Sequence, residues 1–527
     1  MPLVLIVNPP NSNTVLDGPT CTVTRPEDHT DWSDFPHLGT LTLASALAEV
    51  PGVTPVYLDG TVVPWPTILG YIEDHADELL AVCASTLTAT YEAAVALLSH
   101  VKALRPGIRT IVGNDHFSAL TEQCLRNHHA CIDFGFLGNE VIASFRDLVA
   151  DLYQGRLRAL SAYPGLAVWR EGEVLATPQR PEPLFTALRY DLVDAVFEHT
   201  PHYQANFRSR VAPRFRDLLG VDLHAGMPLE IARGCIKFRR DDACSFCSIQ
   251  FGGMWKNSVE DPATAWHAVE RAHDNGYDYL YLTADELPLT FGALLRRMRE
   301  GMPQWWTALP EEERPVMVGY ARADGLSDPR HAETLRQVGV RQLMVGLDAG
   351  SPLSLAAMNK PLSPLRDARP AHRAERMFEH NVQAMQTARD QGLLLKVGFV
   401  IGHLGMTPEL LAENVDSMRE LLHLGKGAIA SLDVEVLSPE PGSRDYRYLT
   451  EPEFADAAAR RVGVGLPDEA ERRSVAERWK PLDVIDREAA MSDYVTAVMP
   501  GLTLDDLAAA RTRIREYGKS SGIVIGE

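Results

Sequence analysis

The sequence predicts an α/β protein built from two successive strand–helix arrays and a helical end region. Short apolar runs alternate with amphipathic stretches up to about residue 150, and the alternation resumes at Pro228. From about Leu449 the sequence becomes helical and charged. Because 527 residues exceed what one hydrophobic core usually sustains, we expect several domains. These are residues 1–150, a linker with a small hairpin over 151–227, residues 228–445 and residues 446–527.

The first array predicts a parallel sheet. Its expected strands are Leu3–Val7, Val53–Leu58, Leu80–Cys83 and Arg109–Val112. Helical stretches such as Leu41–Glu49 and Tyr91–Leu104 separate these strands. Such alternation gives a parallel layer, which binds ligands at the carboxyl ends of its strands. A stretch without sustained periodicity follows, and it contains the proline-rich residues 178–183, which indicate a linker.

The second array predicts a barrel. Its expected strands are Leu229–Ala232, Tyr279–Thr283, Val316–Tyr320, Gln342–Leu347, Leu394–Ile401 and Ser431–Leu437. Six consecutive strand–helix units favour a partial (β/α)6 barrel over a doubly wound sheet. In such barrels the chemistry lies at the carboxyl ends of the strands.

Composition and charge exclude several classes of function. The formal net charge is -20, whereas a protein that neutralises phosphates carries a basic stripe, so nucleic acid is not an expected partner. The run Met1–Val7 lacks the basic flank of a signal peptide, and no apolar run approaches the roughly 18 residues that span a bilayer. We therefore expect a cytoplasmic protein that acts on a small molecule without a membrane partner.

Three of the seven cysteines lie close together, and a disulfide framework does not explain them. Cys235, Cys244 and Cys247 fall in one loop after the first barrel strand. Thiolates are the preferred ligands of iron–sulfur clusters, and three of them leave one iron open to a substrate or cofactor. The alternative is a zinc site in which Cys235 and His224 complete the Cys244-x-x-Cys247 pair.

The loop Arg233-Gly-Cys235 … Cys244-Ser-Phe246-Cys247 resembles the cluster loop of the radical S-adenosylmethionine (SAM) family. The resemblance implies that the three cysteines bind a [4Fe-4S] cluster and that the scattered Cys21, Cys83, Cys124 and Cys131 do not. The first spacing differs from the family pattern, since eight residues, 236–243, stand where three are usual. A longer loop can still close, because the entropy of closure rises slowly with length.

Later strands carry further motifs that resemble this family, in the same order, over about residues 228–445. The most specific is the Gly346-Leu-Asp348-Ala-Gly-Ser351 turn followed by Met358-Asn-Lys360. The resemblance implies that Glu286, rather than its neighbour Asp285, accepts the SAM ammonium. The residues expected to bind SAM are Phe246, Glu286, Arg322, Asp324, Asp348, Ser351 and Val400.

The N-terminal array carries five short motifs: Asn8-Pro-Pro10, Pro36-His-Leu-Gly39, Ser85-Thr-Leu87, Gly113-Asn114 and Gly138-Asn-Glu140. With them, the array resembles the cobalamin-binding, Rossmann-like domains found in many radical SAM enzymes. The residues expected to bind cobalamin are Pro10, Leu38, Gly39, Ser85, Thr86, Leu87, Gly113, Asn114, Gly138 and Glu140. The Asp-x-His-x-x-Gly motif that supplies a histidine to cobalt is absent, and His37 has the wrong spacing. We therefore expect no protein histidine on cobalt. The alternative is an α/β module without cobalamin, kept for packing or substrate binding.

The order of domains resembles that of cobalamin-dependent radical SAM methyltransferases. The resemblance implies a [4Fe-4S] cluster, SAM and methylcobalamin as cofactors, and an external electron donor such as flavodoxin or ferredoxin. It implies methylation of a carbon centre of a small, specialised-metabolite substrate through a 5′-deoxyadenosyl radical, as in antibiotic biosynthesis. Two alternatives remain open: a rearrangement or ring contraction without methylation, and a non-catalytic zinc-binding protein.

Overall fold

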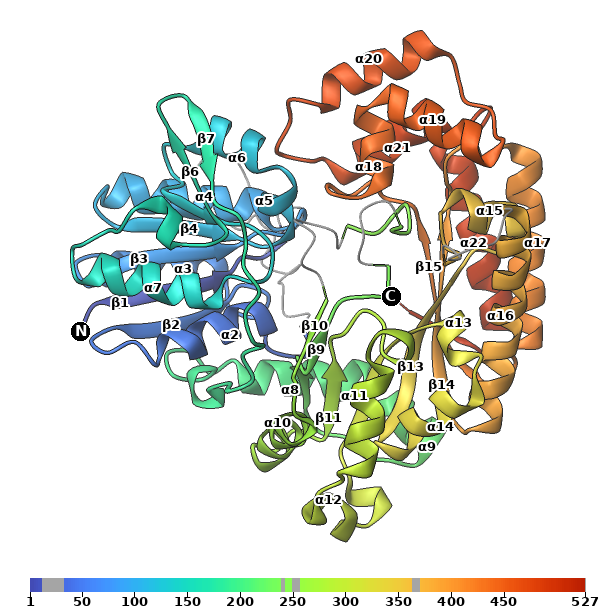
Figure 1. Cartoon of the computed structure of the whole chain (residues 1–527), viewed down its shortest axis with the longest axis horizontal. Coiled ribbons are helices and arrows are strands. Elements are labelled where there is room, and N and C mark those ends of the chain that lie inside the picture. Colours follow the sequence, from blue (N-terminus) through green and yellow to red (C-terminus); the bar gives the residue numbers. More distant parts are fainter. Residues whose placement is uncertain (12–32, 238–241, 249–255, 363–369, 527) are drawn as a thin grey trace. The chain divides into compact units, whose positions relative to one another are not determined.

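The computed structural model describes residues 1–11, 33–237, 242–248, 256–362 and 370–526 (Figure 1). The chain forms two compact units. Unit 1 contains Met1–Ile231 and His267–Tyr281, and unit 2 contains Ala232–Trp266 and Leu282–Glu527. The chain therefore passes between the units at residues 231/232, 266/267 and 281/282. In the described ranges, no helix is both long and apolar enough to cross a membrane.

Unit 1 contains a seven-stranded sheet with the strand order β2-β1-β3-β4-β5-β6-β7. The strands are β1 (Leu3–Asn8), β2 (Thr54–Asp59), β3 (Leu79–Ser85), β4 (Arg109–Gly113), β5 (Phe134–Phe136), β6 (Leu166–Arg170) and β7 (Glu173–Ala176). Strands β1 to β5 are parallel, and β6 and β7 form an antiparallel hairpin at the edge. The predicted Rossmann-like parallel layer is confirmed, and the hairpin expected in the linker extends it.

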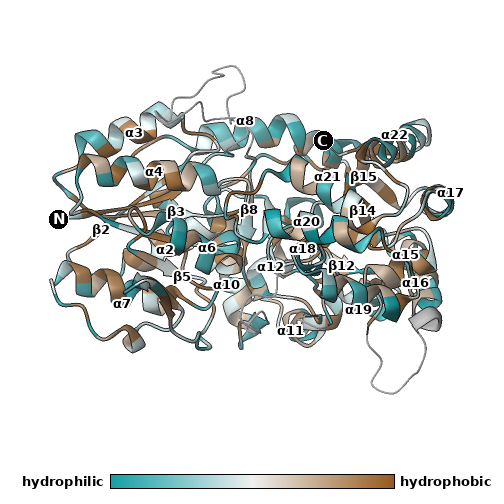
Figure 2. Cartoon of the chain, turned by 90° about the horizontal axis from the view of Figure 1, so that it is seen from above, coloured by the Kyte–Doolittle hydropathy of each residue, from teal (hydrophilic) through white to brown (hydrophobic). Residues whose placement is uncertain are grey.

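Helices follow each strand of the parallel part of this sheet. They are α2 (Leu38–Leu47), α3 (Trp65–Asp74), α4 (Tyr91–Leu104), α5 (Asp115–Ala119), α6 (Thr121–His128) and α7 (Ile142–Tyr153), and after the hairpin α8 (Thr200–Arg210) and α9 (Ala212–Leu219). Figure 2 shows hydrophobic and hydrophilic residues interleaved along α3 and α4. Helix α3 buries Trp65, Ile68 and Ile72 at helical spacing, so one face of it packs into the core.

The second sheet has the strand order β16-β15-β14-β13-β12-β11-β8, which follows the chain from β8 to β16. Its strands are β8 (Gly226–Leu229), β11 (Tyr279–Leu282), β12 (Val316–Arg322), β13 (Val340–Asp348), β14 (Leu394–Ile401), β15 (Ile429–Val436) and β16 (Val524–Ile525). Strands β12 to β16 pair in parallel. The predicted partial barrel of six strands is confirmed. The first strand lies three residues earlier than predicted, and β16 was not predicted.

Strand β14 alternates fully buried and half-buried residues. In β14, Leu395, Val397, Phe399 and Ile401 are at most 1% exposed, whereas the residues between them are half-buried. The helices are α10 (Pro262–Asp274), α11 (Pro288–Glu300), α12 (Gln304–Ala308), α13 (Ala323–Leu326), α14 (Pro329–Gln337), α15 (Pro352–Ala357), α16 (Pro370–Asp390) and α17 (Pro408–Leu424). The period of two places Val400 and Gly398 on the half-buried face of β14.

The C-terminal region is helical, as predicted. Its helices are α18 (Arg444–Thr450), α19 (Pro452–Val462), α20 (Glu469–Trp479), α21 (Arg487–Val498) and α22 (Leu504–Ser520). Helix α22 packs against β15 and α17, and the chain then adds β16 beside β15, with Val524 opposite Ser431. Trp479 and Tyr494 are both buried in this region.

Candidate functional site

The three-cysteine loop begins directly after β9 (Ala232–Arg233), a short strand that pairs with β10 (Asn257–Ser258). Gly234 has a φ of 102°, which glycine adopts without strain, and it turns the chain toward Cys235. Cys235 and Cys244 are each 9% exposed, and Cys247 is half-buried, as is Phe246 between them. Burial raises the pKa of Cys235 to about 11, although Arg322 opposes this.

Three of the other cysteines belong to a different unit from this loop. Cys83, Cys124 and Cys131 are buried in unit 1, and Cys21 lies outside the described residues. Within the described residues, no three His, Cys, Asp or Glu side chains are close enough to hold a single metal ion. His224, which the zinc alternative requires, instead places Nδ1 2.9 Å from the Asp278 carboxylate.

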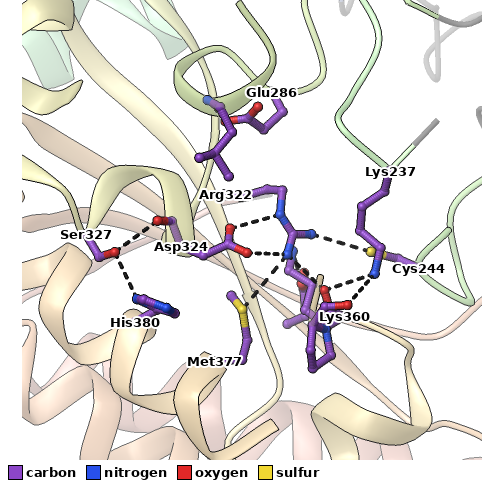
Figure 3. Close-up of polar contacts among 12 residues, drawn as sticks. Lys237, Cys244, Glu286, Arg322, Asp324, Ser327, Lys360, Met377 and His380 are labelled. Atoms are coloured by element: carbon purple, nitrogen blue, oxygen red, sulfur yellow. Dashed lines mark hydrogen bonds and ion pairs between the residues drawn. The ribbon is translucent and has the colours of Figure 1, made fainter. Parts of the chain in front are cut away.

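Arg322, at the end of β12, is the centre of the polar network beside Cys244 (Figure 3). Its guanidinium donates two hydrogen bonds to the Asp324 carboxylate, at 2.9 and 2.8 Å. It also donates to the Lys360 carbonyl at 2.8 Å and lies 3.9 Å from the Cys244 sulfur. Burial disfavours charge on Asp324, but Arg322 more than offsets this and lowers the pKa of that carboxyl. The network therefore holds a charged, buried pair against the cysteine loop.

A second buried ion pair joins Lys360 and Asp348, whose side chains are each 7% exposed. Asp348 ends β13 with a φ of 61°, a strained conformation for a residue other than glycine. Burial disfavours charge on Lys360, but Asp348 more than offsets this and raises the pKa of that ammonium. The two pairs bring three predicted SAM-binding residues, Arg322, Asp324 and Asp348, into one region of unit 2.

Glu286 has a different environment from the one expected of a residue that binds SAM. It is fully buried, and its carboxylate accepts hydrogen bonds from the Leu289 and Thr290 amides and from the Thr290 hydroxyl, at 2.6–2.9 Å. These donors belong to the first turn of α11, so Glu286 caps that helix. The neighbouring Asp285 instead accepts a hydrogen bond from the Gly234 amide at 3.1 Å. Asp285 therefore contacts the cysteine loop directly, which makes it a second candidate for the carboxylate that binds SAM, beside the expected Glu286.

Ser351 is fully buried and caps α15 by accepting a hydrogen bond from the Ser354 amide at 3.2 Å. The Ser354 hydroxyl lies 2.9 Å from Nε2 of the buried His403, whose Nδ1 lies 3.0 Å from the Leu404 carbonyl. Ser351 thus has a structural role in the turn after β13. Val400 of β14 is half-buried.

The side chains around Cys244 suit a negatively charged cluster. Lys237, Arg322 and Lys360 are all less than 10% exposed, and two carboxylates, those of Asp324 and Asp348, pair with the last two cations. These five groups therefore leave one positive charge in excess. A cysteine binds metal as the thiolate, and nearby cations favour that form. The donor set and its surroundings fit an iron–sulfur cluster held by three thiolates.

Unit 1 brings four of its predicted ligand residues together at the carboxyl ends of β3 and β4. The Asn114 side-chain amide donates to the Ser85 hydroxyl at 2.9 Å, and the Thr86 hydroxyl donates to the Gly113 carbonyl at 2.6 Å. Asn114 has a φ of 89°. The next residue after Thr86, Leu87, is 38% exposed beside these ends. Adjacent strand ends with small and polar residues form the usual ligand edge of a parallel sheet.

The remaining predicted cobalamin residues are arranged less uniformly. Leu38 and Gly39 open α2, and Pro10 packs against Gly60. Gly138 has a φ of 69° and donates to Ser118. Glu140 is buried and accepts a hydrogen bond from the Glu182 amide at 3.1 Å, so it anchors the following segment.

His37 caps α2, since its Nδ1 accepts a hydrogen bond from the Thr40 amide at 3.3 Å. Burial lowers its pKa. This histidine therefore has a structural role at the start of α2, and the absence of a protein histidine on cobalt stays a prediction.

Sequence reasoning missed a buried carboxylate at the end of β2. Asp59 accepts hydrogen bonds from Asn8, Thr61 and Tyr203, at 2.6–3.0 Å. Its amide donates to Nε2 of His199 at 3.2 Å. The network ties α8 to the sheet of unit 1. The sequence indicates that Asn8 and Asp59 end neighbouring strands, but it contains no pattern that predicts the contacts of Asp59 with His199 and Tyr203.

Comparisons with known proteins identify similarity both in the N-terminal domain and in the fold of the whole chain. Residues 30–143 match the B12 binding domain family. Over 350 residues, the chain is 25% identical to the anaerobic magnesium-protoporphyrin IX monomethyl ester cyclase of Rubrivivax gelatinosus, a match that covers 64% of this chain. The match spans only 53% of that relative's length.

Two solved structures share the fold. The radical SAM methyltransferase TsrM from Kitasatospora setae, with cobalamin and a [4Fe-4S] cluster bound, matches with a TM-score of 0.67 and 18% identity, over 98% of this chain and 91% of TsrM. TsrM with tryptophan substrate and the SAM analogue aza-SAM matches with a TM-score of 0.59 and 17% identity, over 86% and 76%. The resemblance drawn from the sequence to cobalamin-dependent radical SAM enzymes is confirmed.

Proposed function

We propose that this chain, which contains a B12 binding domain and has the fold of a radical SAM methyltransferase, is a cobalamin-dependent radical SAM enzyme that methylates a carbon atom of a small molecule. The observation that carries the proposal is the loop of three thiols beside the buried Arg322–Asp324 and Lys360–Asp348 pairs. The zinc alternative explains neither these pairs nor the B12 binding domain.

The residues divide among three cofactors. Cys235, Cys244 and Cys247 would hold the [4Fe-4S] cluster, the polar network beside them would hold SAM, and the strand ends of unit 1 would hold cobalamin. When bound, these groups supply single-electron reduction, hydrogen-atom abstraction and methyl carriage, which are chemistry that belongs to the cofactors rather than to side chains. An external electron donor such as flavodoxin or ferredoxin would provide the electrons.

The contribution of the chain itself is to position its ligands and keep water away. Arg322 and Asp324 are held in a fixed bidentate geometry, which orders both side chains before any ligand arrives. The Lys360–Asp348 pair fixes the turn after β13 in the same way. Preorganised groups in a dry site lower the barrier by fixing the orientation of the reacting parts.

The test is anaerobic reconstitution followed by assay with SAM labelled in its methyl group. We expect about four iron atoms per chain, lost on Cys244→Ala, and bound cobalamin. Candidate acceptors begin with tryptophan, since a TsrM structure contains it. A labelled product with a new carbon–methyl bond supports the proposal, and a colourless, zinc-loaded protein contradicts it.

A second candidate function rests on one observation, the match to a ring-forming cyclase. In that case the enzyme uses the same cofactors but makes a product without a new methyl group. The ratio of methylated product to 5′-deoxyadenosine separates the two. A substrate that is consumed with 5′-deoxyadenosine release and without label transfer favours the cyclase-like reaction.

A further inference from the structure

The eight-residue stretch between Cys235 and Cys244 raises a structural question, because a longer connection holds its two ends less firmly than a short one. Three thiols must be placed together if they are to share one cluster. The described residues at both ends of this stretch, 236–237 and 242–243, show how the chain meets that requirement. Both ends are fixed to the same short segment, Met358–Pro361, which follows α15.

Lys237 fixes the first end. Lys237 is 3% exposed, and its ammonium donates to the main-chain carbonyls of three consecutive residues, Asn359, Lys360 and Pro361, the last two at 3.1 and 3.0 Å (Figure 3). An ammonium has three protons to donate, and these carbonyls match that number. Burying a charge is unfavourable unless such partners compensate it. The position of Lys237 is therefore set by the carbonyls of this segment.

Asn359 fixes the second end. Its side-chain amide donates to the Ala243 carbonyl at 2.7 Å, directly before Cys244. Asn359 has a φ of 50°, a conformation that asparagine tolerates better than most residues, and this turn directs its carbonyl to Lys237. Directly after Cys244, the Ser245 amide donates to the Met358 carbonyl at 2.8 Å. Cys244 is thus held on both sides by neighbouring residues of one segment.

We propose that Met358–Pro361 is a template to which both described ends of the enlarged connection, at Lys237 and Ala243, are fixed, and that Lys237 and Asn359 are positioning residues that place Cys244 relative to Cys235. The inference rests on the proposed function in one respect, namely that the three thiols share a cluster. It explains why an eight-residue spacing is compatible with cluster binding: the contacts to the template replace the constraint that a short connection would supply.

The experiment compares the full-length chain with Lys237→Met, which keeps the apolar stem, and with Asn359→Gly, which keeps the positive φ and removes the amide. Lys102→Met is the matched control, because Lys102 also donates to a main-chain carbonyl, that of Ile108 at 2.8 Å, but lies in unit 1. Arg461→Ala is the control for the hydrogen bond that Arg461 donates to the Asn359 side-chain oxygen at 2.9 Å. The readouts are iron and sulfide per chain, the EPR spectrum of the reduced cluster with and without SAM, and thermal unfolding.

We expect Lys237→Met and Asn359→Gly to lower iron per chain at least twofold at limiting iron and to change the EPR spectrum with SAM, while both controls match the unaltered chain. Wild-type iron content and spectra in both variants would overturn the inference alone. If the unaltered chain takes up no iron, the proposed function fails instead. Should Lys237→Met fail to fold, Asn359→Gly decides the outcome by the same readouts.

Discussion

Asp285 and Glu286 are adjacent in the chain but have different partners, and this sets what each side chain is expected to do. We predict that Glu286→Gln lowers the free energy of unfolding by about 1–2 kcal/mol, because it weakens the cap of α11. We predict that Asp285→Asn weakens SAM binding by about tenfold, since a charge-assisted hydrogen bond is lost. Calorimetric titration with SAM and urea unfolding of both variants test this. The opposite ranking for SAM affinity would favour Glu286, as expected from the sequence.

Because His403 is buried, we expect the stability of the barrel to depend on pH. Burial lowers its pKa to about 4, although its hydrogen bond to the Leu404 carbonyl opposes this. In the unfolded chain the pKa of histidine is about 6.5. The stabilisation is therefore fully present above about pH 6.5 and is lost as the pH falls toward 4, by a total of about 3 kcal/mol.

We predict that His403→Gln removes most of the loss of stability between pH 7 and pH 4.5. Urea unfolding of the variant at several pH values measures the slope, with His267→Gln, a substitution at an exposed histidine, as the control. An unchanged slope in His403→Gln would show that other groups cause the acid sensitivity.

At the scale of elements, Tyr494 of α21 connects the C-terminal helices to the cysteine loop. Its hydroxyl donates to the fully buried Asp445 carboxylate at 2.5 Å, and the Asp445 amide donates to the Ser245 carbonyl at 3.0 Å. Burial raises the pKa of Asp445 to about 6, although the Tyr494 hydroxyl opposes this. Helices α18 and α21 of the C-terminal region thus help to fix Ser245, which lies between Cys244 and Cys247.

We predict that Tyr494→Phe lowers the free energy of unfolding by about 1–3 kcal/mol, because a buried carboxylate loses a donor. Iron per chain after reconstitution should fall in the same variant, since Asp445 holds Ser245. Tyr517→Phe on α22 is the matched control, as that ring lies under Arg419 and is only half-buried. Equal stability of the two variants would contradict the prediction.

The sequence predicted the elements whose apolar runs are long and missed those that depend on partners. The four long strands of unit 1 and six strands of the barrel were expected near their observed positions. Strand β5 has three residues and β16 has two, which is too short for a periodic signal. The motif order singled out Arg322, Asp324 and Asp348, and the structure places these three residues in one polar network. The contacts of Glu286 and Lys237 depend on the direction of their side chains, which cannot be predicted from the sequence of a loop.

At the scale of the molecule, the two candidate cofactor sites belong to different units and are expected to fail separately. Asn114 has a φ of 89°, which glycine adopts easily and a β-branched residue does not. We predict that Asn114→Val lowers cobalamin per chain about tenfold through strain at the strand end, and that Asn114→Gly does so less. Iron per chain should be unchanged in both. Loss of iron together with cobalamin would show that the sites are not independent.

The three passages of the chain between its units restrict how the protein is synthesised and how it can be recombined. Unit 1 requires His267–Tyr281, which the ribosome delivers only after Ala232–Trp266, a stretch of unit 2 that includes the cysteines. Unit 1 therefore cannot complete its fold during translation before Cys235, Cys244 and Cys247 have left the ribosome. For the same reason, a chimera that exchanges everything before residue 232 for the domain of another protein would lack fifteen native residues of that unit, 267–281. Module exchange in this architecture has to transfer two separate segments together.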